Sequence, residues 1–527
     1  MIDVRSLTFR YPAAARDALD DVTLSIDDAA FVVVAGDSGS GKSTFVHAIC
    51  GLVPHFTGGT FSGSVTIAGR DTRTQAPRDL ADVAGFVAQD PTAQSVVDRV
   101  EDEIVFAMEN LGVDPTIMRK RLEEVLDATA IAPLRERRLQ TLSGGERQRL
   151  AIAAVLAAQP RVLLLDEPTS QLDPQSAEEV LGVLQRLNAD LGLTIVLVEH
   201  RLERVVQHAD TMIVLADGRV VAHGSPRAVL SSGAATTPLS SLARALGWNP
   251  MPLTVREGRA FAASMAVGPR LAAHPSPSRP LVEARNLRVA LGGRDVLRGV
   301  DLTACAGETV AIVGRNGSGK TTLVRALVGL VRARTGSVSI VDFDPARDAV
   351  ERIAARVAYV PQSADSILFH ETVRDEIRFT LRSRSATEDP DDVIARAGLE
   401  AFAALDPRDL SAGERLRVAL LAATAGAPDV ILLDEPTRGM DARGKDELAR
   451  VVDAWRSEGR ATVIVSHDVE LVARVATRVV MIAEGSVVVD GPVREVLGES
   501  ALFSSQMNKV FGDRRILTID DALEAIR

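Results

Sequence analysis

The sequence predicts an α/β protein built from two successive copies of one domain. An apolar run at residues 31–35 is followed by the glycine-rich stretch 36–43 and then by a helical pattern, which indicates a strand, a loop and a helix. The same order recurs at residues 309–321. An apolar run that ends in Asp-Glu-Pro also occurs twice, at residues 163–168 and 431–436. Repetition on this scale indicates duplication of a whole domain.

The bulk composition agrees with this organisation and excludes several classes of protein. The chain has 527 residues, which is long enough for two domains with complete cores. Its net charge of −11 provides no global basic field for nucleic acid. Two cysteines, Cys50 and Cys305, are too few for a zinc site or a disulfide framework, so we expect small buried side chains in a reducing compartment. We see no signal peptide and no apolar run of the roughly 18 residues that a membrane span needs, so we expect any membrane role to depend on a partner.

Both glycine-rich stretches have the form G-x-x-x-x-G-K-[ST] between a strand and a helix, which is typical of a phosphate-binding loop. Glycines let successive backbone N–H groups point at phosphate oxygens, and the start of the helix adds partial positive charge. We expect Lys42 to reach the β- and γ-phosphates and Ser43 to help hold Mg²⁺. The predicted nucleotide-binding residues here are Gly36, Asp37, Ser38, Gly39, Ser40, Gly41, Lys42, Ser43 and Thr44, and Gly314, Arg315, Asn316, Gly317, Ser318, Gly319, Lys320, Thr321 and Thr322.

The acidic strand ends supply the predicted chemistry. Asp166 and Asp434 follow buried strands of parallel type, where carboxylates are suited to Mg²⁺. Glu167 and Glu435 come one residue later, and we expect them to polarise the attacking water as general bases. Each predicted metal site therefore combines an aspartate with a loop hydroxyl and a glutamine. The hydroxyls are those of Ser43 and Thr321, and the glutamines are Gln89 and Gln362.

Glutamine and histidine also recur in register in the two copies. Gln89 and Gln362 each follow a strand, and we expect their amides to contact Mg²⁺ or the attacking water. His200 and His467 each end a strand, and we expect them to contact the γ-phosphate and to fix the geometry of water and glutamate. A single glutamine of this kind is usually a solvated loop residue and a single histidine is usually structural. Their repetition in both copies favours catalytic roles.

A second anion-binding segment follows the helix-rich stretches 96–140 and 370–408. A serine and small residues open a helix there, which brings a hydroxyl, bare backbone N–H groups and the helix N-terminus together, although a simple helix cap has the same pattern. The residues are Ser143, Gly144, Gly145 and Glu146 in the first copy, and Ser411, Ala412, Gly413 and Glu414 in the second.

An aromatic side chain precedes the first loop. Tyr11 is placed to stack on a purine, a contact of about 1–3 kcal/mol by analogy with base stacking. A turn aromatic that covers the edge of the sheet is the alternative. The second copy has Leu291 at the matching position, so we expect a weaker adenine contact there.

The domain boundaries follow from these copies. We predict a first domain over residues 1–235, a linker over 236–280, a second domain over 281–498 and a tail over 499–527. Because the linker interval is rich in proline and serine, we expect it to be extended and solvated. It lacks the length and positive charge of an RNA-probing hairpin. The tail shows amphipathic helical patches, to which we assign no role.

Together these motifs resemble the nucleotide-binding domains of the ATP-binding cassette (ABC) family. The resemblance implies two tandem P-loop ABC nucleotide-binding domains, each with a RecA-like α/β core, a helical subdomain and an N-terminal antiparallel β part. It also implies head-to-tail pairing, in which ATP and Mg²⁺ bind between the loop of one domain and the Ser-Gly-Gly segment of the other. Ala412 replaces the usual glycine and Leu291 the usual aromatic, which implies a slower first site and weaker binding at the second.

Within that family the sequence resembles energy-coupling factor (ECF) ATPases over residues 52–63, 89–94 and 100–112. The resemblance implies a peripheral ATPase at the cytoplasmic face of the cell membrane. Its partners are an integral-membrane T component and a small substrate-binding S component, which import a vitamin or a transition-metal ion. We hypothesise that acidic side chains meet arginines of the T component, although a solvated helix face is an equal alternative. These side chains are Asp98, Glu101, Asp102, Glu103, Asp375 and Glu376.

Three other ABC classes are weighed against this hypothesis. The double ATPase of sugar importers has a similar length, but its second anion-binding segment usually departs further from Ser-Gly-Gly-Glu. A ribosome-associated ABC ATPase also carries two domains in one chain, but the basic linker expected of it is absent here. A DNA-repair ABC ATPase needs zinc cysteines, which two cysteines do not provide. No nucleic-acid partner is expected.

Overall fold

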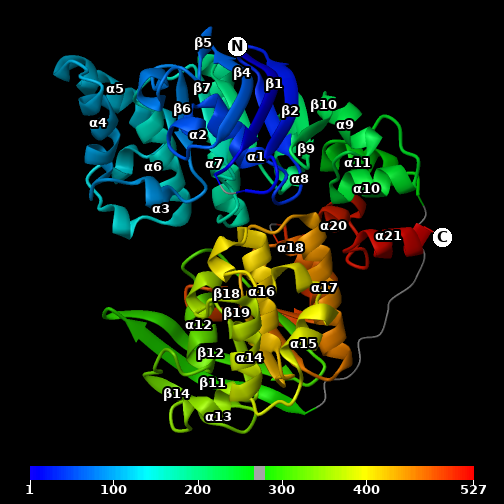
Figure 1. The fold of residues 1–527 in the computed structure, drawn as a ribbon. Coiled ribbons are helices and arrows are strands. Elements are labelled where there is room, and N and C mark those ends of the chain that lie inside the picture. Colours follow the sequence, from blue (N-terminus) through cyan, green and yellow to red (C-terminus); the bar gives the residue numbers. More distant parts are fainter. Residues whose placement is uncertain (13, 266–278, 502, 527) are drawn as a thin grey trace. The chain divides into compact units, whose positions relative to one another are not determined.

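The chain folds into two compact units, residues 1–261 and 262–527, each described here by itself. The computed structural model describes residues 1–12, 14–265, 279–501 and 503–526. In Figure 1 the first unit runs from blue to green and the second from green to red, and both combine sheets with covering helices. The predicted duplication of an α/β domain is confirmed.

The first unit has two sheets. A four-stranded antiparallel sheet has the order β2-β1-β4-β5, and a six-stranded sheet has the order β10-β9-β3-β8-β7-β6, parallel except for the β9–β10 edge. The strands are β1 (Ile2–Arg10), β2 (Leu19–Ile26), β3 (Phe31–Ala35), β4 (Thr60–Ile67), β5 (Arg70–Asp71), β6 (Ala84–Val87), β7 (Val162–Asp166), β8 (Thr194–Val198), β9 (Thr211–Ala216) and β10 (Arg219–Gly224). The helices are α1 (Lys42–Ile49), α2 (Leu52–His55), α3 (Pro91–Gln94), α4 (Val100–Asn110), α5 (Pro115–Ala128), α6 (Gly144–Leu156), α7 (Pro174–Leu191), α8 (Leu202–Val205), α9 (Pro226–Ser232), α10 (Pro238–Ala245) and α11 (Val255–Ala262).

The second unit repeats this plan. Its antiparallel sheet has the order β12-β11-β14, and its mainly parallel sheet has the order β15-β16-β17-β13-β18-β19. The strands are β11 (Pro280–Leu291), β12 (Arg294–Cys305), β13 (Thr309–Val313), β14 (Thr335–Ile340), β15 (Val357–Val360), β16 (Val430–Asp434), β17 (Ala461–Val465), β18 (Arg478–Ala483) and β19 (Ser486–Pro492). The helices are α12 (Lys320–Leu327), α13 (Val350–Ala354), α14 (Val373–Ser383), α15 (Pro390–Arg396), α16 (Ala412–Thr424), α17 (Ala442–Ser457), α18 (Val469–Val475), α19 (Val493–Gly498), α20 (Gln506–Phe511) and α21 (Ile519–Ile526).

The central strands explain why the functional loops share one edge in each unit. Every residue of β3, β7 and β8 is buried, because these strands are covered on both faces and are apolar along their whole length. Side chains of the antiparallel sheet, such as Phe9 and Val65, pack into the same core as Val32 of β3 and Leu164 of β7. Since β3, β7 and β8 run parallel, the segments that follow them emerge together at their carboxyl ends.

The helix-rich stretches predicted after each glutamine are also present. The first contains α4 and α5, and the second contains α14 and α15. Helix α4 and helix α14 have 11 residues each, but α5 has 14 residues and α15 has only 7. The second copy is therefore shortened within this helical part.

The prediction of an extended, solvated linker is wrong for most of residues 238–262. Helices α10 and α11 form there, and Leu239, Leu242 and Trp248 are buried. The apolar side chains recur at helical spacing within an interval whose average composition is dominated by proline and serine. Residues 266–278 of the predicted linker lie outside the described part of the chain. The helical patches predicted in the tail are confirmed as α20 and α21.

These terminal helices form the same small module in both units. Arg227 on α9 donates to the carbonyl oxygen of Met251 and to the carboxylate of Glu257, and that carboxylate also accepts the N–H of Leu253. In the second unit Arg494 on α19 donates in the same way to the carbonyl oxygen of Arg515 and to Asp521, which accepts the N–H of Leu517. The duplicated unit therefore extends through α11 in the first copy and through α21 in the second.

We expect Asp521 to stabilise the terminal module at neutral pH. Burial by itself raises the pKa of Asp521, but the Arg494 guanidinium and the N–H groups of Leu517 and Thr518 outweigh it and hold the pKa below its ordinary value. The resulting stabilisation is complete above the unfolded-state pKa and is lost as pH falls through the folded-state pKa. Asp521→Asn should lower the free energy of unfolding by about 1–3 kcal/mol at pH 7, as measured by urea unfolding, with a smaller difference in acid.

The neighbouring Asp520→Asn is the control, because that side chain is exposed. Glu257→Gln in the first unit should cost less than Asp521→Asn, since the side chain of Glu257 is 38% exposed and that of Asp521 only 19%. Equal stability of Asp521→Asn and wild type at pH 7 contradicts this account of the module.

Candidate active sites

Each glycine-rich loop forms a tight turn between a strand and a helix. Gly36 has φ +145°, and a Cβ atom there would lie 2.2 Å from the carbonyl oxygen of Leu215, so only glycine fits. Lys42 opens α1, and its ammonium donates to the carbonyl oxygens of Gly36 at 2.9 Å and Asp37 at 2.7 Å.

Lys320 makes the same contacts in the second unit. Its ammonium donates to the carbonyl oxygens of Gly314 at 2.8 Å and Arg315 at 2.9 Å. Both predicted phosphate-binding loops therefore hold a lysine charge inside the turn, at the start of a helix.

An aspartate and a hydroxyl lie together beside each loop. Ser43 donates to Asp166, and Thr321 donates to Asp434 at 3.1 Å. Burial raises the pKa of Asp166 to about 6 against the opposing effect of the Ser43 hydrogen bond, and burial likewise raises the pKa of Asp434. Among the described residues, Oδ1 of Asp166 and Oδ2 of Asp434 are buried without a hydrogen-bond partner.

This arrangement fits the predicted Mg²⁺. A nucleotide-bound Mg²⁺ takes one or two protein oxygens and completes its shell with phosphate oxygens and water. One carboxylate with an unused oxygen and one adjacent hydroxyl provide that set. In the described parts of the chain, no group of three or more His, Cys, Asp or Glu side chains is placed to hold a metal.

The first predicted general base, Glu167, is held by two side chains. Its carboxylate lies 2.8 Å from Nε2 of His200 and accepts a hydrogen bond from Nε2 of Gln89 at 2.9 Å. Burial alone raises the pKa of Glu167, but the hydrogen bond from His200 and the positive charges nearby, including Lys42, outweigh it and hold the pKa below its ordinary value. The predicted trio of glutamate, histidine and glutamine is therefore brought together, with an ionised base.

The second site has the same glutamate and histidine but a different environment. Nε2 of His467 lies 3.0 Å from Oε1 of Glu435, and the backbone N–H of His467 donates to Oε2 at 3.2 Å. Gln362 is exposed, and no hydrogen bond joins it to Glu435 in the portion that the structure describes. Gln89 and Gln362 therefore hold the same position in the two copies but make different contacts.

Glu199 is a buried positioning residue that the sequence analysis missed. Its carboxylate accepts the hydroxyl of Thr169 at 2.5 Å and the backbone N–H groups of His200 and Arg201 at 3.1 and 3.2 Å. It fixes the backbone that carries His200. The sequence did contain one sign of this role, because Glu199 directly follows an apolar strand. A carboxylate buried at such a place is stable only when hydrogen-bond donors surround it. Ser466 stands at this position in the second unit and accepts the N–H of Asp468.

The segments predicted as anion sites open helices α6 and α16. Ser143 and Glu146 form a capping box, and so do Ser411 and Glu414. The serine oxygens and glutamates therefore satisfy backbone N–H groups at these helix starts, and the nucleotide contacts of these residues stay a prediction. The side chain of Ala412 lies outside the described side chains.

The predicted adenine contact is not tested by the structure. The hydroxyl of Tyr11 lies 3.1 Å from that of Thr44, and its ring packs edge-on against Phe9. Tyr11 is thus next to the phosphate loop, as its prediction requires. Leu291 is 46% exposed.

Part of the acidic hypothesis is wrong. Glu103 and Glu376 are buried, and their carboxylates hold loops by accepting backbone N–H groups, of Val96 and Val97 in the first unit and of Phe369 and His370 in the second. These two carboxylates are therefore inaccessible to a partner.

Of the remaining acidic side chains, two form ion pairs within the chain and two are exposed, so that a partner could reach them. Glu101 pairs with Arg135 at 2.6 Å, and Asp375 pairs with Arg378. Asp98 and Asp102 are exposed.

Comparison with known proteins decides the family. The model of the ABC transporter family matches residues 19–170 and 297–438. The chain belongs to the ABC transporter ATP-binding family. It is therefore an ABC ATPase, an enzyme that hydrolyses ATP.

Relatives extend over the entire chain. A putative ABC transporter ATP-binding protein of Streptomyces coelicolor is 43% identical and covers 100% of both chains. One of Methanosarcina mazei is 33% identical over 94% of this chain and 90% of its own. The first of these alignments includes both terminal modules.

Solved structures resemble the chain at the level of the fold. An archaeal ribosome recycling factor, aABCE1, in complex with the stalk protein aP1 is 22% identical with a TM-score of 0.61, and covers 94% of this chain and 91% of its own. CbiO1 of Clostridium perfringens, part of the transporter complex cbiONQ, is 27% identical with a TM-score of 0.41, and covers 47% of this chain and 95% of its own.

We expect Glu167 and Glu435 to carry the hydrolytic step. The double variant Glu167→Gln/Glu435→Gln should lower phosphate release by about 10²-fold or more, because a general base contributes on that scale. ATP binding should change by less than about threefold, since the lysines and aspartates remain. Steady-state phosphate release and equilibrium nucleotide binding measure the two effects. Glu178→Gln, at an exposed position on α7, is the control, and undiminished hydrolysis in the double variant contradicts the assignment.

Proposed function

We propose that this protein is the ATP-hydrolysing subunit of an ECF-type importer of a vitamin or a transition-metal ion. It acts through a separate membrane T component, which works with a small S component, and it lies at the cytoplasmic face of the membrane. Family membership and the two ATP sites support the ATPase part, and the ECF-like residues 52–63, 89–94 and 100–112 support the subgroup. No helix among the described residues is long and apolar enough to cross a bilayer.

The residues of each site have distinct roles in this proposal. The loop N–H groups and Lys42 bind the phosphates, and Ser43 with Asp166 holds Mg²⁺, which neutralises charge on the phosphates. Glu167 accepts a proton from the attacking water, while His200 and Gln89 keep its carboxylate ionised and oriented.

The corresponding set of the second site is Lys320, Thr321, Asp434, Glu435 and His467. From the family resemblance we further propose that the domains pair head to tail, with each ATP contacting the Ser-Gly-Gly or Ser-Ala-Gly segment of the other domain.

The observation that carries the membrane-partner proposal is an apolar groove beside Gln89. It has a volume of about 420 Å³ and lies among β6, α3, α4 and α6. Val96 is 61% exposed at this groove, Leu111 43% and Phe106 37%. A cluster of exposed apolar side chains marks an interaction surface, and this one fits an apolar side chain of a partner helix. Because the groove adjoins the segment that contacts Glu167, a partner there is placed to sense the catalytic state.

The second unit differs at the matching place. Helices α4 and α14 have the same length, and Leu111 and Arg384 directly follow them. The guanidinium of Arg384 donates to the carbonyl oxygens of Val357 on β15 and Ala423 on α16. It therefore lies at the place that corresponds to the groove of the first unit. Exposed Phe369 and Phe379 remain nearby. We therefore propose that the T component contacts the two domains through unlike segments.

Co-purification tests this function. The tagged full-length chain, isolated from detergent-solubilised source cells, should bring down a polytopic membrane protein and a small S-like membrane protein. Phe106→Glu should lower their recovery by about tenfold or more, because it places a charge in the apolar groove. Leu191→Glu is the matched control, since Leu191 is 64% exposed at the end of α7. ATP hydrolysis by the isolated variant verifies that it is folded.

Other outcomes distinguish the alternatives. Recovery of ribosomes, with a strong dependence on salt, identifies a ribosome-associated ATPase instead. A polytopic pair with a periplasmic or lipid-anchored sugar-binding protein identifies an importer of the sugar type. Absence of any membrane partner contradicts the transport role and leaves the ATPase assignment intact.

A further inference from the structure

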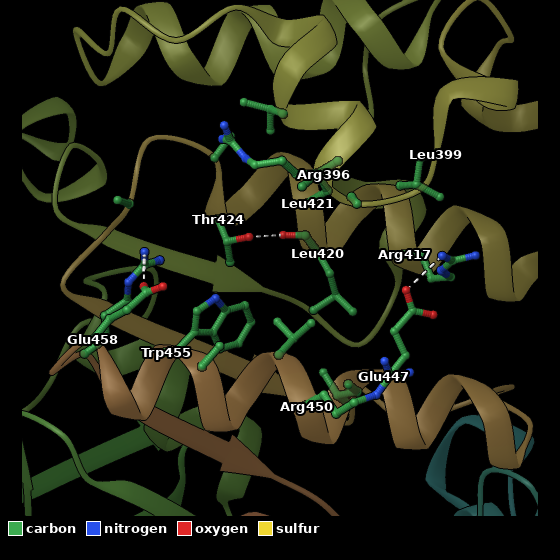
Figure 2. A pocket seen from close by; sticks show the side chains of 18 of the residues that line it. Arg396, Leu399, Arg417, Leu420, Leu421, Thr424, Glu447, Arg450, Trp455 and Glu458 are labelled. Carbon is green, nitrogen blue, oxygen red and sulfur yellow. Dashed lines mark hydrogen bonds and ion pairs between the residues drawn. The ribbon is translucent and has the colours of Figure 1, made fainter.

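The second unit contains a cavity of about 640 Å³ away from its ATP-binding residues. It lies among α15, α16 and α17, and Figure 2 shows Trp455 and Arg450 on one side with Arg396 and Leu399 on the other. Its apolar lining includes Leu420 on α16. The lining combines apolar side chains with seven charged ones, four arginines and three glutamates, and a volume of this size is typical of small-molecule sites.

Comparison with the first unit explains why the cavity exists. The pairs Arg149–Glu179 and Arg417–Glu447 join α6 to α7 and α16 to α17 in the same way, which aligns the two helix pairs. Four residues after the glutamates, Val183 is 1% exposed, whereas Val451 is 38% exposed.

The difference follows from the helix that packs above. Helix α5 has 14 residues and contacts α7, whereas α15 has 7 residues. The shorter helix leaves Val451 of α17 exposed, and Trp455, which is 7% exposed, also lines the cavity. The cavity therefore accompanies the shorter helix of the second copy.

The cavity is surrounded by an excess of positive charge. Three arginines at its edge have carboxylate partners, in the pairs Arg396–Glu388, Arg417–Glu447 and Arg460–Glu458. In the described part of the chain, Arg450 and Arg384 have no carboxylate within ion-pair distance.

Arg384 adjoins one end of the cavity, where its guanidinium donates to the carbonyl oxygens of Ala423 and Ala425. Burial, with a smaller contribution from the charge of Arg460, lowers the pKa of Arg384 to about 10. An anion in the cavity would relieve this accumulation of positive charge.

We propose that this cavity binds a small planar organic anion, with an aromatic carboxylate as the simplest example. The ring system lies against Trp455, Val451 and Leu420, where its apolar surface leaves water. The carboxylate faces Arg450 at the rim, and guanidinium binds carboxylate with two parallel hydrogen bonds. A cation is disfavoured by the same charges, and a neutral ring lacks the ionic contact.

The site is placed to influence the ATPase unit that contains it. Helix α16 begins at the Ser411 segment. Helix α17 begins directly after Asp441, in the segment that follows β16 and its last residue, Asp434. A ligand between α15, α16 and α17 joins the helical part of the domain to its core. We therefore expect the ligand to raise the thermal unfolding midpoint of the second unit.

Two tryptophans make the binding directly measurable. The chain contains only Trp248 and Trp455, and Trp248 lies in the first unit stacked on Phe261. In the full-length Trp248→Phe variant, 1-naphthoate should change the fluorescence of Trp455 saturably with a Kd below about 1 mM. The cation 1-naphthylmethylamine should bind at least about tenfold more weakly. Trp455→Phe should abolish the fluorescence change, and calorimetry on the wild-type chain should give one site.

Two variants test the location of the site. Arg450→Glu should weaken naphthoate binding by about fivefold or more, whereas Arg347→Glu, an equal charge change at a position 86% exposed elsewhere in the unit, should leave it unchanged. Val451→Phe should weaken binding by filling the cavity, and ATP hydrolysis at the wild-type rate verifies that each variant is folded.

The proposal is overturned by any of three results. The first is the absence of saturable naphthoate binding up to about 1 mM by calorimetry. The second is equal binding of the anion and the cation, which identifies a non-selective apolar surface. The third is equal affinity in Arg450→Glu and Arg347→Glu, which places the ligand elsewhere.

Discussion

The contact on which the first site depends is that of Glu167 with His200 and Gln89. The three residues come from segments that follow β7, β8 and β6, so their meeting requires the parallel order of the sheet. Glu167 has φ +49°, and its N–H donates to the carbonyl oxygen of Val198, which turns the chain sharply after Asp166. The same turn leaves the aspartate beside the loop hydroxyl and directs the glutamate toward the histidine. The proposed metal site and the proposed general base are therefore positioned by one backbone feature.

The two copies share this chemistry but support it differently. In the first site, Gln89 donates a hydrogen bond to Glu167, and the buried carboxylate of Glu199 accepts the backbone N–H of His200. In the second site, the corresponding residues are Gln362, which is exposed, and Ser466. Arg384 occupies the place that remains open in the first unit. The shorter α15 adds a cavity to the second unit. Divergence has therefore changed the surroundings of the second site while retaining its lysine, aspartate, glutamate and histidine.

The motifs carried enough information to predict the fold and most of the candidate site. A glycine-rich loop between strand and helix, or an acidic pair after a buried strand, specifies local geometry within about ten residues, so the sequence indicated that Lys42 opens a helix after the loop and that Glu167 follows a buried strand. The sequence did not reveal Glu199, because its role depends on Thr169 and on backbone donors from another segment. Helices α10 and α11 of the first unit were missed because their apolar spacing is diluted by proline and serine, whereas the helical pattern of the tail was recognised. The difference between Gln89 and Gln362 depends on loop conformation, which equal sequence position does not determine.

The most direct test of this account is single-turnover ATP hydrolysis with one site active at a time. Gln89→Ala is compared with its parent in a Glu435→Gln background, and Gln362→Ala with its parent in a Glu167→Gln background. The account predicts that Gln89→Ala slows hydrolysis by about tenfold or more, because it removes an amide that orients the base, and that Gln362→Ala slows it by less than about threefold. Equal losses at both sites would contradict the claim that only the first base depends on its glutamine.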